Sequence, residues 1–288
     1  MKTPTRAGNT GAGYKVLCSK GCASYSWERK SCLKLSKMVS KSTLVKRIII
    51  YILTTGMPNQ ANSQTFVPNE ILQNVFHIKF DSRTASCFRI SYDSSDCLVT
   101  ARHLFPSSLP NNSRIEIETF GNGKWLKQQV TLLLHINTSI DIAVLKLDTN
   151  NQKQNLFEID SKGFYLSQEC FFLGYPFGLM MDDKDSKFNS GFPVPFVKRG
   201  IISSFTPGPT DMMLIYIDGI NNPGFSGGPV VVSNRDGTGK MKCIGVVSAY
   251  INENKVVKTP IGDFINSQNS GIIVSYASDH IFEVLKRK

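Results

Sequence analysis

Residues 64–288 of this chain lack an excess of charge of either sign. The full chain of 288 residues has a formal net charge of +11, a balance typical of proteins that bind nucleic acid. Residues 1–63 hold 11 of the 33 Lys and Arg residues but only one of the 22 acidic residues. The rest of the chain is nearly neutral, so we expect no nucleic-acid partner.

The sequence also lacks, near its N-terminus, an apolar run of the ~20 residues that a membrane-spanning helix requires. The apolar segment 48–53 is short, follows basic residues and precedes the small residues at 61–63. This arrangement is typical of a cleavable signal peptide. We interpret residues 38–63 as that peptide and residues 1–37 as a leader that precedes the true start at Met38. The expected location is secreted or periplasmic, with no stable membrane anchor.

Cysteine is scarce after the leader, where the four cysteines are Cys87, Cys97, Cys170 and Cys243. An even number in an exported chain permits two disulfides, and Cys87 and Cys97 flank a predicted hairpin, which makes them the expected pair. Buried free thiols that act as small apolar side chains are an alternative of equal standing. The two closely spaced cysteines of the leader have no second Cys or His pair to complete a zinc site. We therefore expect no metal and no cofactor.

From residue 66 onward the sequence contains short apolar or alternating runs, separated by Gly, Pro, Asn and Asp. Such runs are typical of strands in a sandwich or a barrel. The predicted strands are 75–80, 86–92, 97–101, 114–120, 125–135, 140–147, 164–166, 169–174, 196–205, 212–217, 229–233, 241–250 and 271–277. An Asn-rich stretch near 149–155 separates two groups of strands, so we expect domains at 64–150 and 151–288. Residues 278–288 are predicted to form a helix that Ser278 caps.

The segment 222–230 surrounds Ser226 with three glycines and two prolines. Because glycine lets the backbone adopt tight conformations, this loop can aim the N–H groups of Gly224 and Ser226 at one point beside the Ser226 hydroxyl. The oxyanion of an acyl-transfer intermediate would be stabilised at such a point. A lone Gly-x-Ser-x-Gly is more often an ordinary turn. The interpretation therefore depends on a base and on a residue that orients it.

Both partners occur upstream of the serine. His103 ends a short apolar run, and Asp141 is the one charged residue within the strand-like segment 139–145. A charge in an apolar segment is costly unless it is paired. We therefore expect Asp141 to accept a hydrogen bond from an imidazole N–H.

Together, the segments Thr-Ala-Arg-His103, Asp141-Ile-Ala-Val-Leu and Gly-Phe-Ser226-Gly-Gly-Pro-Val resemble the three triad motifs of trypsin-like (chymotrypsin-fold) serine proteases. The resemblance implies that His103 is the general base, Asp141 its orienting carboxylate and Ser226 the nucleophile, with Gly224 and Ser226 forming the oxyanion hole. It also implies an all-β fold of two six-stranded antiparallel barrels with the site between them. The expected activity is that of a serine endopeptidase acting on proteins or peptides. A protease-like binding protein without turnover is the alternative.

Two further segments, 174–178 and 222–224, look more like bacterial HtrA-type proteases than digestive trypsins. The sequence stops at residue 288, so we expect no PDZ module after the second barrel. Phe225 occupies the position where zymogen-type trypsins carry an aspartate that pairs with the new N-terminus. Activation through that ion pair is therefore not expected.

α/β-Hydrolases share the serine motif, but they place it before a helix and carry their histidine after the serine. Here Pro229 and three valines follow, which predicts a strand, and the one later histidine is His280. The trypsin-like interpretation is therefore favoured. His77 and His135 lie among apolar residues and are expected to be structural.

The trypsin-like resemblance also indicates a specificity pocket. Ile220, six positions before the nucleophile, would lie at the base of the pocket for the side chain preceding the cut, with Asn221 beside it. Ser248 and Tyr250 would line one wall, where Tyr250 replaces a glycine of trypsins. An apolar base and a narrowed wall favour small or medium aliphatic side chains, although Asn221 can shift the preference toward polar ones.

Overall fold

The computed structural model of the protein describes residues 65–148, 158–181, 189, 191–207, 212–234 and 238–287. The chain divides into two units, Met1–Ser63 and Gln64–Lys288, and every described residue belongs to the second. The predicted leader, the predicted signal peptide and the Asn-rich stretch at 149–155 lie outside the described residues. Among the residues that are described, no helix is both long and apolar enough to cross a membrane.

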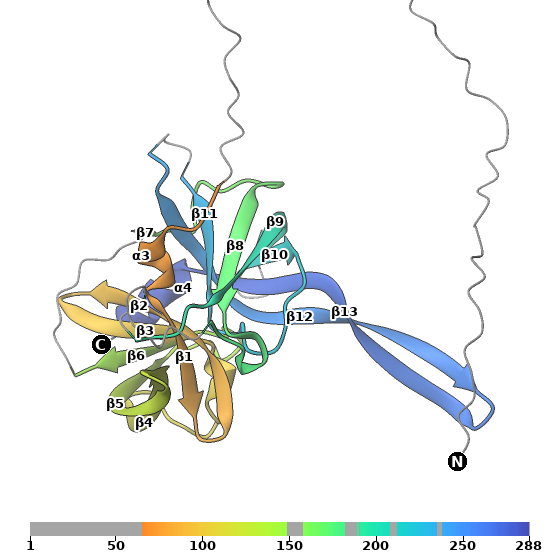
Figure 1. The fold of residues 1–288 in the computed structure, drawn as a ribbon, viewed down its shortest axis with the longest axis horizontal. Helices are drawn as coiled ribbons and strands as arrows, with labels where there is room; N and C mark the ends of the chain where they lie inside the picture. Colours follow the sequence, from red (N-terminus) through yellow and green to blue (C-terminus); the bar gives the residue numbers. More distant parts are fainter. Residues whose placement is uncertain are drawn as a thin grey trace, which may run out of the picture. The chain divides into compact units, whose positions relative to one another are not determined.

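The strands before residue 148 form a closed barrel in the order β1-β2-β3-β6-β5-β4, with neighbouring strands antiparallel (Figure 1). Alternate side chains of a strand point to opposite faces, and along β4 the buried and the more exposed residues alternate in this way. The inward-facing apolar side chains form one core cluster, and their removal from water stabilises the barrel. The strands are β1 Val75–Phe80, β2 Arg83–Tyr92, β3 Ser95–Thr100, β4 Ser113–Gly121, β5 Lys124–Leu134 and β6 Ala143–Leu147.

Seven strands form the second sheet, in the order β11-β8-β9-β10-β13-β12-β7. Because β11 also pairs with β12, six of these strands form a closed antiparallel circuit, and the short β7 is added to β12 in parallel. The predicted all-β fold is thus confirmed. The strands are β7 Glu158–Ile159, β8 Glu169–Gly174, β9 Phe196–Pro207, β10 Met213–Asp218, β11 Pro229–Ser233, β12 Met241–Thr259 and β13 Gly262–Ala277.

Helical segments in the described part of the chain are short: α3 Asn69–Leu72, η2 Arg102–Leu104, η3 Pro176–Gly178 and α4 Asp279–Leu285. The predicted C-terminal helix corresponds to α4, whose Ile281 and Val284 are buried against the core. The predicted role of Ser278 as its cap is wrong. The Ser278 hydroxyl instead donates to the carbonyl oxygen of Cys243 at 3.0 Å, and no side-chain bond caps the helix.

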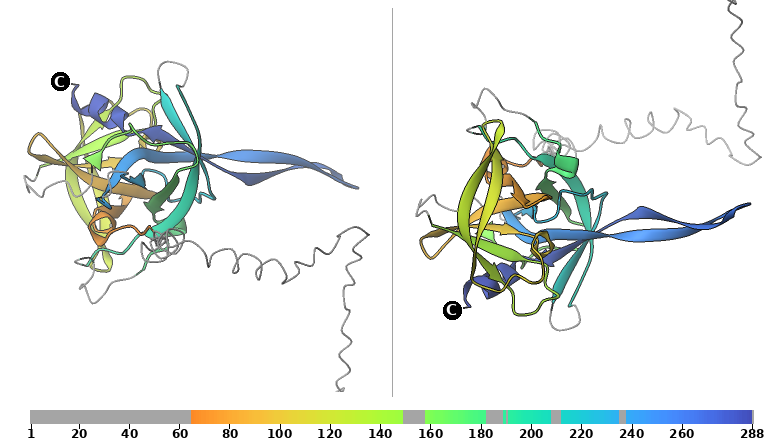
Figure 2. Two further views of the ribbon diagram at one scale, coloured as in Figure 1. Left: turned by 90° about the horizontal axis from the view of Figure 1, so that it is seen from above. Right: turned by 90° about the horizontal axis from the view of Figure 1, so that it is seen from below.

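Two strands of the second sheet are much longer than predicted. β12 and β13 continue past the sheet as an antiparallel hairpin, which projects from the rest of the fold in all three views (Figures 1 and 2). We call residues 251–270 the arm. The predicted strands 241–250 and 271–277 are the parts of β12 and β13 that lie within the sheet.

Two smaller strand predictions also differ from the structure. The predicted strand 164–166 is wrong, since this segment is loop and turn in which Phe164 is buried while Tyr165 and Leu166 are exposed. β7 was not predicted. It consists of two residues whose pairing partner on β12 is distant in sequence.

The expected disulfide between Cys87 and Cys97 is wrong, and the alternative of buried free thiols is confirmed for all four cysteines. In the β2–β3 register, Cys87 lies opposite Thr100 and Cys97 lies opposite Ile90. The two thiols therefore point to opposite faces of the sheet, and they belong to separate apolar clusters. Burial raises the pKa of Cys97 to about 11.

Candidate active site

Two predicted site residues are brought together by the first barrel. His103 lies in η2, directly after β3, and Asp141 lies just before β6, and these two strands are paired neighbours. His103 Nδ1 is 2.7 Å from Asp141 Oδ2, and the backbone N–H of His103 donates to Asp141 Oδ1 at 2.8 Å. The imidazole is thus oriented by two contacts to a single carboxylate.

The second sheet supplies a third donor to this carboxylate. The hydroxyl of Ser248, on β12, donates to Asp141 Oδ2 at 2.5 Å. Because a carboxylate only accepts hydrogen bonds, the proton of neutral His103 lies on Nδ1 and the lone pair lies on Nε2. The bond to Asp141 raises the pKa of His103, although burial and the nearby charge of Arg83 act in the opposite direction.

Ser226 lies in the loop before β11, which we call the nucleophile loop (residues 222–228). Two of its glycines have positive φ angles, +108° at Gly224 and +83° at Gly227. A Cβ atom at Gly224 would lie 2.2 Å from the carbonyl oxygen of Tyr175, and one at Gly227 would lie 2.2 Å from that of Ser86. Both conformation and space therefore require glycine at these positions.

The nucleophile loop presents one hydroxyl and two unused backbone donors. The Ser226 hydroxyl donates to the carbonyl oxygen of Ser248 at 2.9 Å. Phe225 N–H donates to Asn222 within the loop. By contrast, the N–H groups of Gly224 and Ser226 have no hydrogen-bond acceptor among the described residues. These are the two groups that the sequence predicted as an oxyanion hole.

Ser86, on β2 of the first barrel, holds the nucleophile loop and was not predicted as a site residue. Its N–H donates to Ser226 O at 2.9 Å and its hydroxyl donates to Gly224 O at 2.6 Å. The same hydroxyl accepts a hydrogen bond from Tyr175 N–H at 3.0 Å. Ser86 is fully buried. Its one signal in the sequence is a small polar residue within the apolar run 85–88.

The predicted pocket residues occupy different environments. Ile220 is 60% exposed, and its carbonyl oxygen accepts a hydrogen bond from Lys198 Nζ at 2.5 Å. Asn221 is only 2% exposed and donates to the carbonyl oxygen of Ala249 at 3.5 Å. Tyr250 is half-buried. The pocket assignment stays a prediction, in which Asn221 is the buried member of the pair at the base.

Three other side chains converge where the segment after β5 meets α4. His135 Nε2 and His280 Nδ1 each lie 2.8 Å from Glu283 Oε2, and the three atoms are within 4.8 Å of one another. Two imidazoles and a carboxylate are a donor set that zinc takes in proteins. The remaining nitrogen of each ring, however, accepts a backbone N–H, from Asn137 at 3.0 Å and from Met213 at 3.3 Å.

The ring protons of both histidines therefore lie on the nitrogens that face Glu283. No lone pair is left there for a metal, so the cluster of His135, His280 and Glu283 is a set of hydrogen bonds and not a metal site. It joins α4 to the segment that leads to Asp141.

His77 is buried within an aromatic layer. Its ring stacks on Tyr175 at 5.1 Å between centroids and lies 4.9 Å from the ring centroid of Trp125. Burial lowers the pKa of His77 to about 4, so the ring is neutral at pH 7. Neither ring nitrogen has a hydrogen-bond partner among the described residues, so the contacts described for the ring are those with Tyr175 and Trp125.

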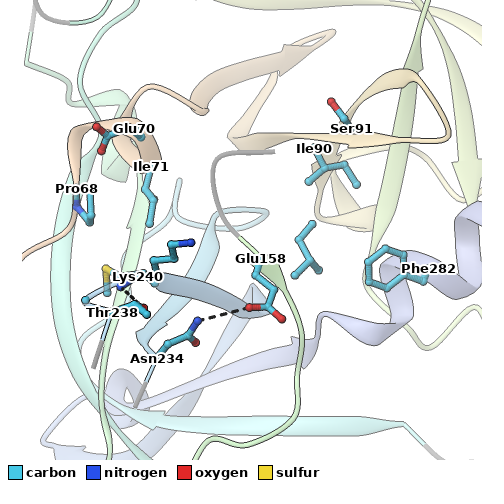
Figure 3. A pocket seen from close by; sticks show the side chains of 13 residues that line it. Pro68, Glu70, Ile71, Ile90, Ser91, Glu158, Asn234, Thr238, Lys240 and Phe282 are labelled. Carbon is cyan, nitrogen blue, oxygen red and sulfur yellow. Dashed lines mark hydrogen bonds between the residues drawn. The ribbon is translucent and has the colours of Figure 1, made fainter. Parts of the chain in front are cut away.

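A cavity of about 600 Å³ lies between α3, the end of β2, β7 and α4. Glu70, Glu158 and Phe282 are among the side chains that line it, and Asn234 donates to Glu158 Oε2 at 3.5 Å across one wall (Figure 3). None of His103, Asp141 and Ser226 lines this cavity. The candidate chemistry is instead located where the first barrel meets the second sheet.

Comparison with solved structures shows a shared fold. The Rv3671c protease from M. tuberculosis in its active form superimposes with a TM-score of 0.50 at 16% identity, over 81% of this chain and 88% of that chain. Its inactive form gives a TM-score of 0.49 at 17% identity, over 81% and 97%. The HtrA-type protease AlgW with tripeptide gives 0.49 at 21% identity, over 76% of this chain and 62% of that chain. At these identities the likeness concerns the fold alone.

No curated protein matches the sequence. The profile of a protein family described as trypsin-like peptidase domain, however, matches residues 85–240, more than half of the chain. The matched range contains His103, Asp141 and Ser226. The resemblance predicted from three short motifs is thus confirmed, and the chain belongs to the family of trypsin-like peptidase domains.

Proposed function

We propose that this protein is an exported serine endopeptidase that cleaves peptide bonds through an acyl-enzyme intermediate. The observation that carries the proposal is the link that Ser248 makes between the two halves of the site. Its hydroxyl donates to Asp141, which holds His103, and its carbonyl oxygen accepts the hydroxyl of Ser226. Ser248 of β12 is therefore hydrogen-bonded both to the carboxylate that orients the proposed base and to the proposed nucleophile.

In the proposed reaction, the Ser226 hydroxyl turns from the Ser248 carbonyl toward His103 Nε2 and attacks the scissile carbonyl carbon. His103 accepts the hydroxyl proton and then gives it to the leaving amine, while Asp141 stabilises the imidazolium and fixes the tautomer. Water attacks the acyl-enzyme in the second half, with His103 again as the base. Hydrogen bonds between catalytic groups are often long or absent before substrate binds, so the resting position of Ser226 is compatible with this role.

The N–H groups of Gly224 and Ser226 would bind the oxyanion of the tetrahedral intermediate. They are free donors in a loop whose conformation only glycine permits. A donor fixed before the reaction needs no reorganisation during it, and removal of one such donor costs ~3–4 kcal/mol in a serine protease of a different fold. This preorganised pair supports acyl transfer over simple peptide binding.

Labelling by a fluorophosphonate probe tests the proposal against the alternative of a binding protein without turnover. The protein should be labelled at Ser226 and should hydrolyse peptides, and Ser226→Ala should lose both. Asp141→Asn should lower kcat by ~10⁴-fold, because the imidazole would be held in the wrong tautomer. EDTA should leave the activity unchanged. An unlabelled protein, near-normal activity in His103→Ala, or a loss with EDTA that zinc restores would contradict the mechanism.

Export is the second part of the proposal. It rests on the signal-like segment 38–63, which lies outside the described residues. Secretion or passage to the periplasm would expose the enzyme to proteins or peptides outside the cytoplasm as substrates.

For specificity we propose small or medium aliphatic side chains, such as Val, Ala or Leu, before the cut. Ile220 offers no carboxylate to receive Lys or Arg, and each buried CH₂ of an aliphatic side chain contributes ~0.8 kcal/mol. Tyr250→Gly should widen acceptance to Phe. Matched peptides that differ only at this residue give the ratios of kcat/KM, and a preference for Arg or Lys would refute the pocket assignment.

A further inference from the structure

The strand that contacts the proposed catalytic groups continues into the arm, with register shifts at Ser248 and at Ile251. β12 runs from Met241 to Thr259, and Ser248, which contacts both Asp141 and Ser226, lies within it. The rest of β12 and the first half of β13 project from the fold (Figures 1 and 2). The arm is therefore an extension of the active site along one strand.

One edge of this strand is unpaired beyond the site. On one side β12 pairs with β13 between Gly245 and Thr259, except at the register shifts that leave out Ser248 and Ile251. On the other side β11 pairs only as far as Val246, and the nucleophile loop then contacts Val247 through two backbone hydrogen bonds, of 2.7 and 2.9 Å. No described strand pairs with this edge after Ser248. It is the edge at which the hydroxyl of Ser226 meets Ser248.

An exposed strand edge presents a row of backbone donors and acceptors that another extended chain can pair with. Proteins usually prevent such pairing with charges on the strand, with proline or with a cover. The arm has two acidic and two basic residues, so its net charge is zero, and its one proline, Pro260, is at the turn. Residues 251–259 themselves contain no proline, and of their three charged residues, Glu253, Lys255 and Lys258, the first two form an ion pair at 3.4 Å. Proline and a covering strand are thus absent from this described edge, and its charges are partly paired.

The side chains of the arm divide it into a polar stem and an apolar tip. Residues 252–255 and 266–269 are polar or charged. Nearer the turn, the cross-strand pairs Val256–Ile265 and Val257–Phe264 lie on opposite faces. Their side chains are 44–74% exposed, and Ile261 at the turn is 87% exposed. The tip therefore offers apolar surface on both faces.

We propose that the arm binds the substrate itself. A polypeptide in extended conformation would add as an antiparallel strand to the free edge of β12, on the N-terminal side of the bond to be cut, and its more distant apolar side chains would contact the tip. This inference rests on the proposed function, in which Ser248 and Tyr250 flank the pocket for the residue before the cut. The substrate residues that precede the residue in the pocket would then lie along residues 251–259 of β12. These nine residues span about 30 Å at ~3.3 Å per residue.

The substrate class that fits is an unfolded or loosely folded protein. Only such a chain can present about ten consecutive residues in extended form, and backbone pairing makes the contact tolerant of sequence. Apolar residues that reach the tip, about eight to ten positions before the cut, would be favoured. A membrane surface fits less well, because the arm has no excess of basic residues to attract anionic lipid.

A peptide-length series tests the inference. Three peptides share the sequence around the cut: one has about four residues before it, the second has about twelve, and the third is the second with N-methylated amides at alternate positions of its extension. The long peptide should have a kcat/KM at least tenfold above that of the short one. The N-methylated peptide, which cannot complete the backbone pairing, should resemble the short peptide. An N-methylated peptide that keeps the full advantage would overturn pairing through the backbone.

Two variants connect the effect to the arm. In the first, an Asn-Gly turn joins Glu253 to Gln268 in place of residues 254–267, which retains Asn269 and its hydrogen bond to Asn221 O. The ratio of the long-peptide to the short-peptide kcat/KM should fall to about 1. In the second, Val256→Ser with Ile265→Ser keeps the backbone and should lower the ratio severalfold. Ile201→Ser, at a comparably exposed apolar position on β9, should leave it unchanged.

The outcomes separate this inference from the proposed function. Cleavage of all peptides at equal rates would support the proposed protease activity and would overturn the proposed role of the arm. If no peptide is cleaved, fluorescence anisotropy of the labelled peptides with Ser226→Ala protein decides. If the long peptide binds more tightly than the short one, and truncation of the arm removes this difference, the proposed role of the arm is supported. Equal binding of the two peptides would overturn that role. A truncation that only converts a dimer to a monomer, or only abolishes sedimentation with anionic vesicles, would also overturn it.

Discussion

The nucleophile loop and the arm meet the same strand, β12, and differ in how their backbones are supported. Gly227 in the loop and Gly271 at the base of the arm have nearly the same φ, +83° and +81°. A Cβ atom at Gly227 would meet Ser86, Thr100 and Ala101 at 2.2–2.7 Å, whereas one at Gly271 would meet nothing within 4 Å. A glycine with nearly the same φ is thus enclosed in one region and open in the other.

This difference matches two tasks proposed for the site: the loop holds the reacting groups, and the arm binds the extended substrate. The loop is held by Ser86 of the first barrel and by Val247 of β12, so its donors are fixed before any substrate arrives. Beyond the bond from Asn269 to Asn221 O at its base, the described part of the arm is supported by its own hairpin pairing, and an isolated two-stranded hairpin is marginally stable in water. The proposed chemistry would therefore take place on rigid backbone, while the arm that is proposed to bind the substrate can adapt.

The largest effect on folding should come from filling the enclosed glycine. Gly227→Ala combines a left-handed conformation, which costs about 1–2 kcal/mol, with contacts that force the backbone to shift. We expect it to lower the free energy of unfolding by about 3 kcal/mol or more and to abolish activity. Gly271→Ala carries only the conformational cost, about 1–2 kcal/mol. Urea denaturation measures both, and equal losses would contradict the contrast between the two regions.

A smaller effect should follow from loosening the loop. Ser86→Ala leaves the buried carbonyl of Gly224 and the N–H of Tyr175 unpaired, at a cost of about 1–3 kcal/mol. Because the loop also carries the oxyanion donors, kcat should fall by roughly tenfold while KM changes little. Ser203→Ala, on the exposed face of β9, should change neither quantity. A stability loss in Ser86→Ala with normal kcat would show that Ser86 supports only the fold.

The smallest effect concerns the charge of Arg83, next to His103 and Asp141. Activity should rise with pH, because only neutral His103 can accept the serine proton, and the midpoint should lie above 6.5, since the bond to Asp141 raises the pKa of His103. Arg83 lowers that pKa, so Arg83→Ala should move the midpoint further upward. Arg199→Ala, which removes an exposed partner of Glu169, is the matched control. A midpoint that does not move would show that Arg83 has no influence on the base.

Sequence reasoning identified the candidate site residues that lie within short motifs. His103, Asp141 and Ser226 are each surrounded by a local pattern, and the strands beside them follow from apolar alternation, so both were predictable. Ser86 was not, because its role arises from bonds to residues 138 and 89 positions away. The arm was missed for a different reason. Its stem is polar on both faces, so the pattern that marks a half-buried strand ends where the arm begins.

The prediction of a disulfide between Cys87 and Cys97 is wrong for a geometric reason. Cys87 and Cys97 are close in sequence and on adjacent strands, which is all that spacing can show. Whether two side chains share a face depends on the register of β2 and β3, which the turn at 93–94 sets. An error of one residue in that turn reverses the answer.

The cluster of His135, His280 and Glu283 determines when, during synthesis, one contact near Asp141 can form. α4 follows both β-structures in the chain, yet Glu283 binds the segment that leads from β5 to Asp141. During synthesis the N-terminal part of a protein can fold first. Here the hydrogen bond between His135 and Glu283 forms only after α4 has emerged. A nascent chain that already carries His103, Asp141 and Ser226 therefore still lacks this contact to the segment before the proposed catalytic carboxylate.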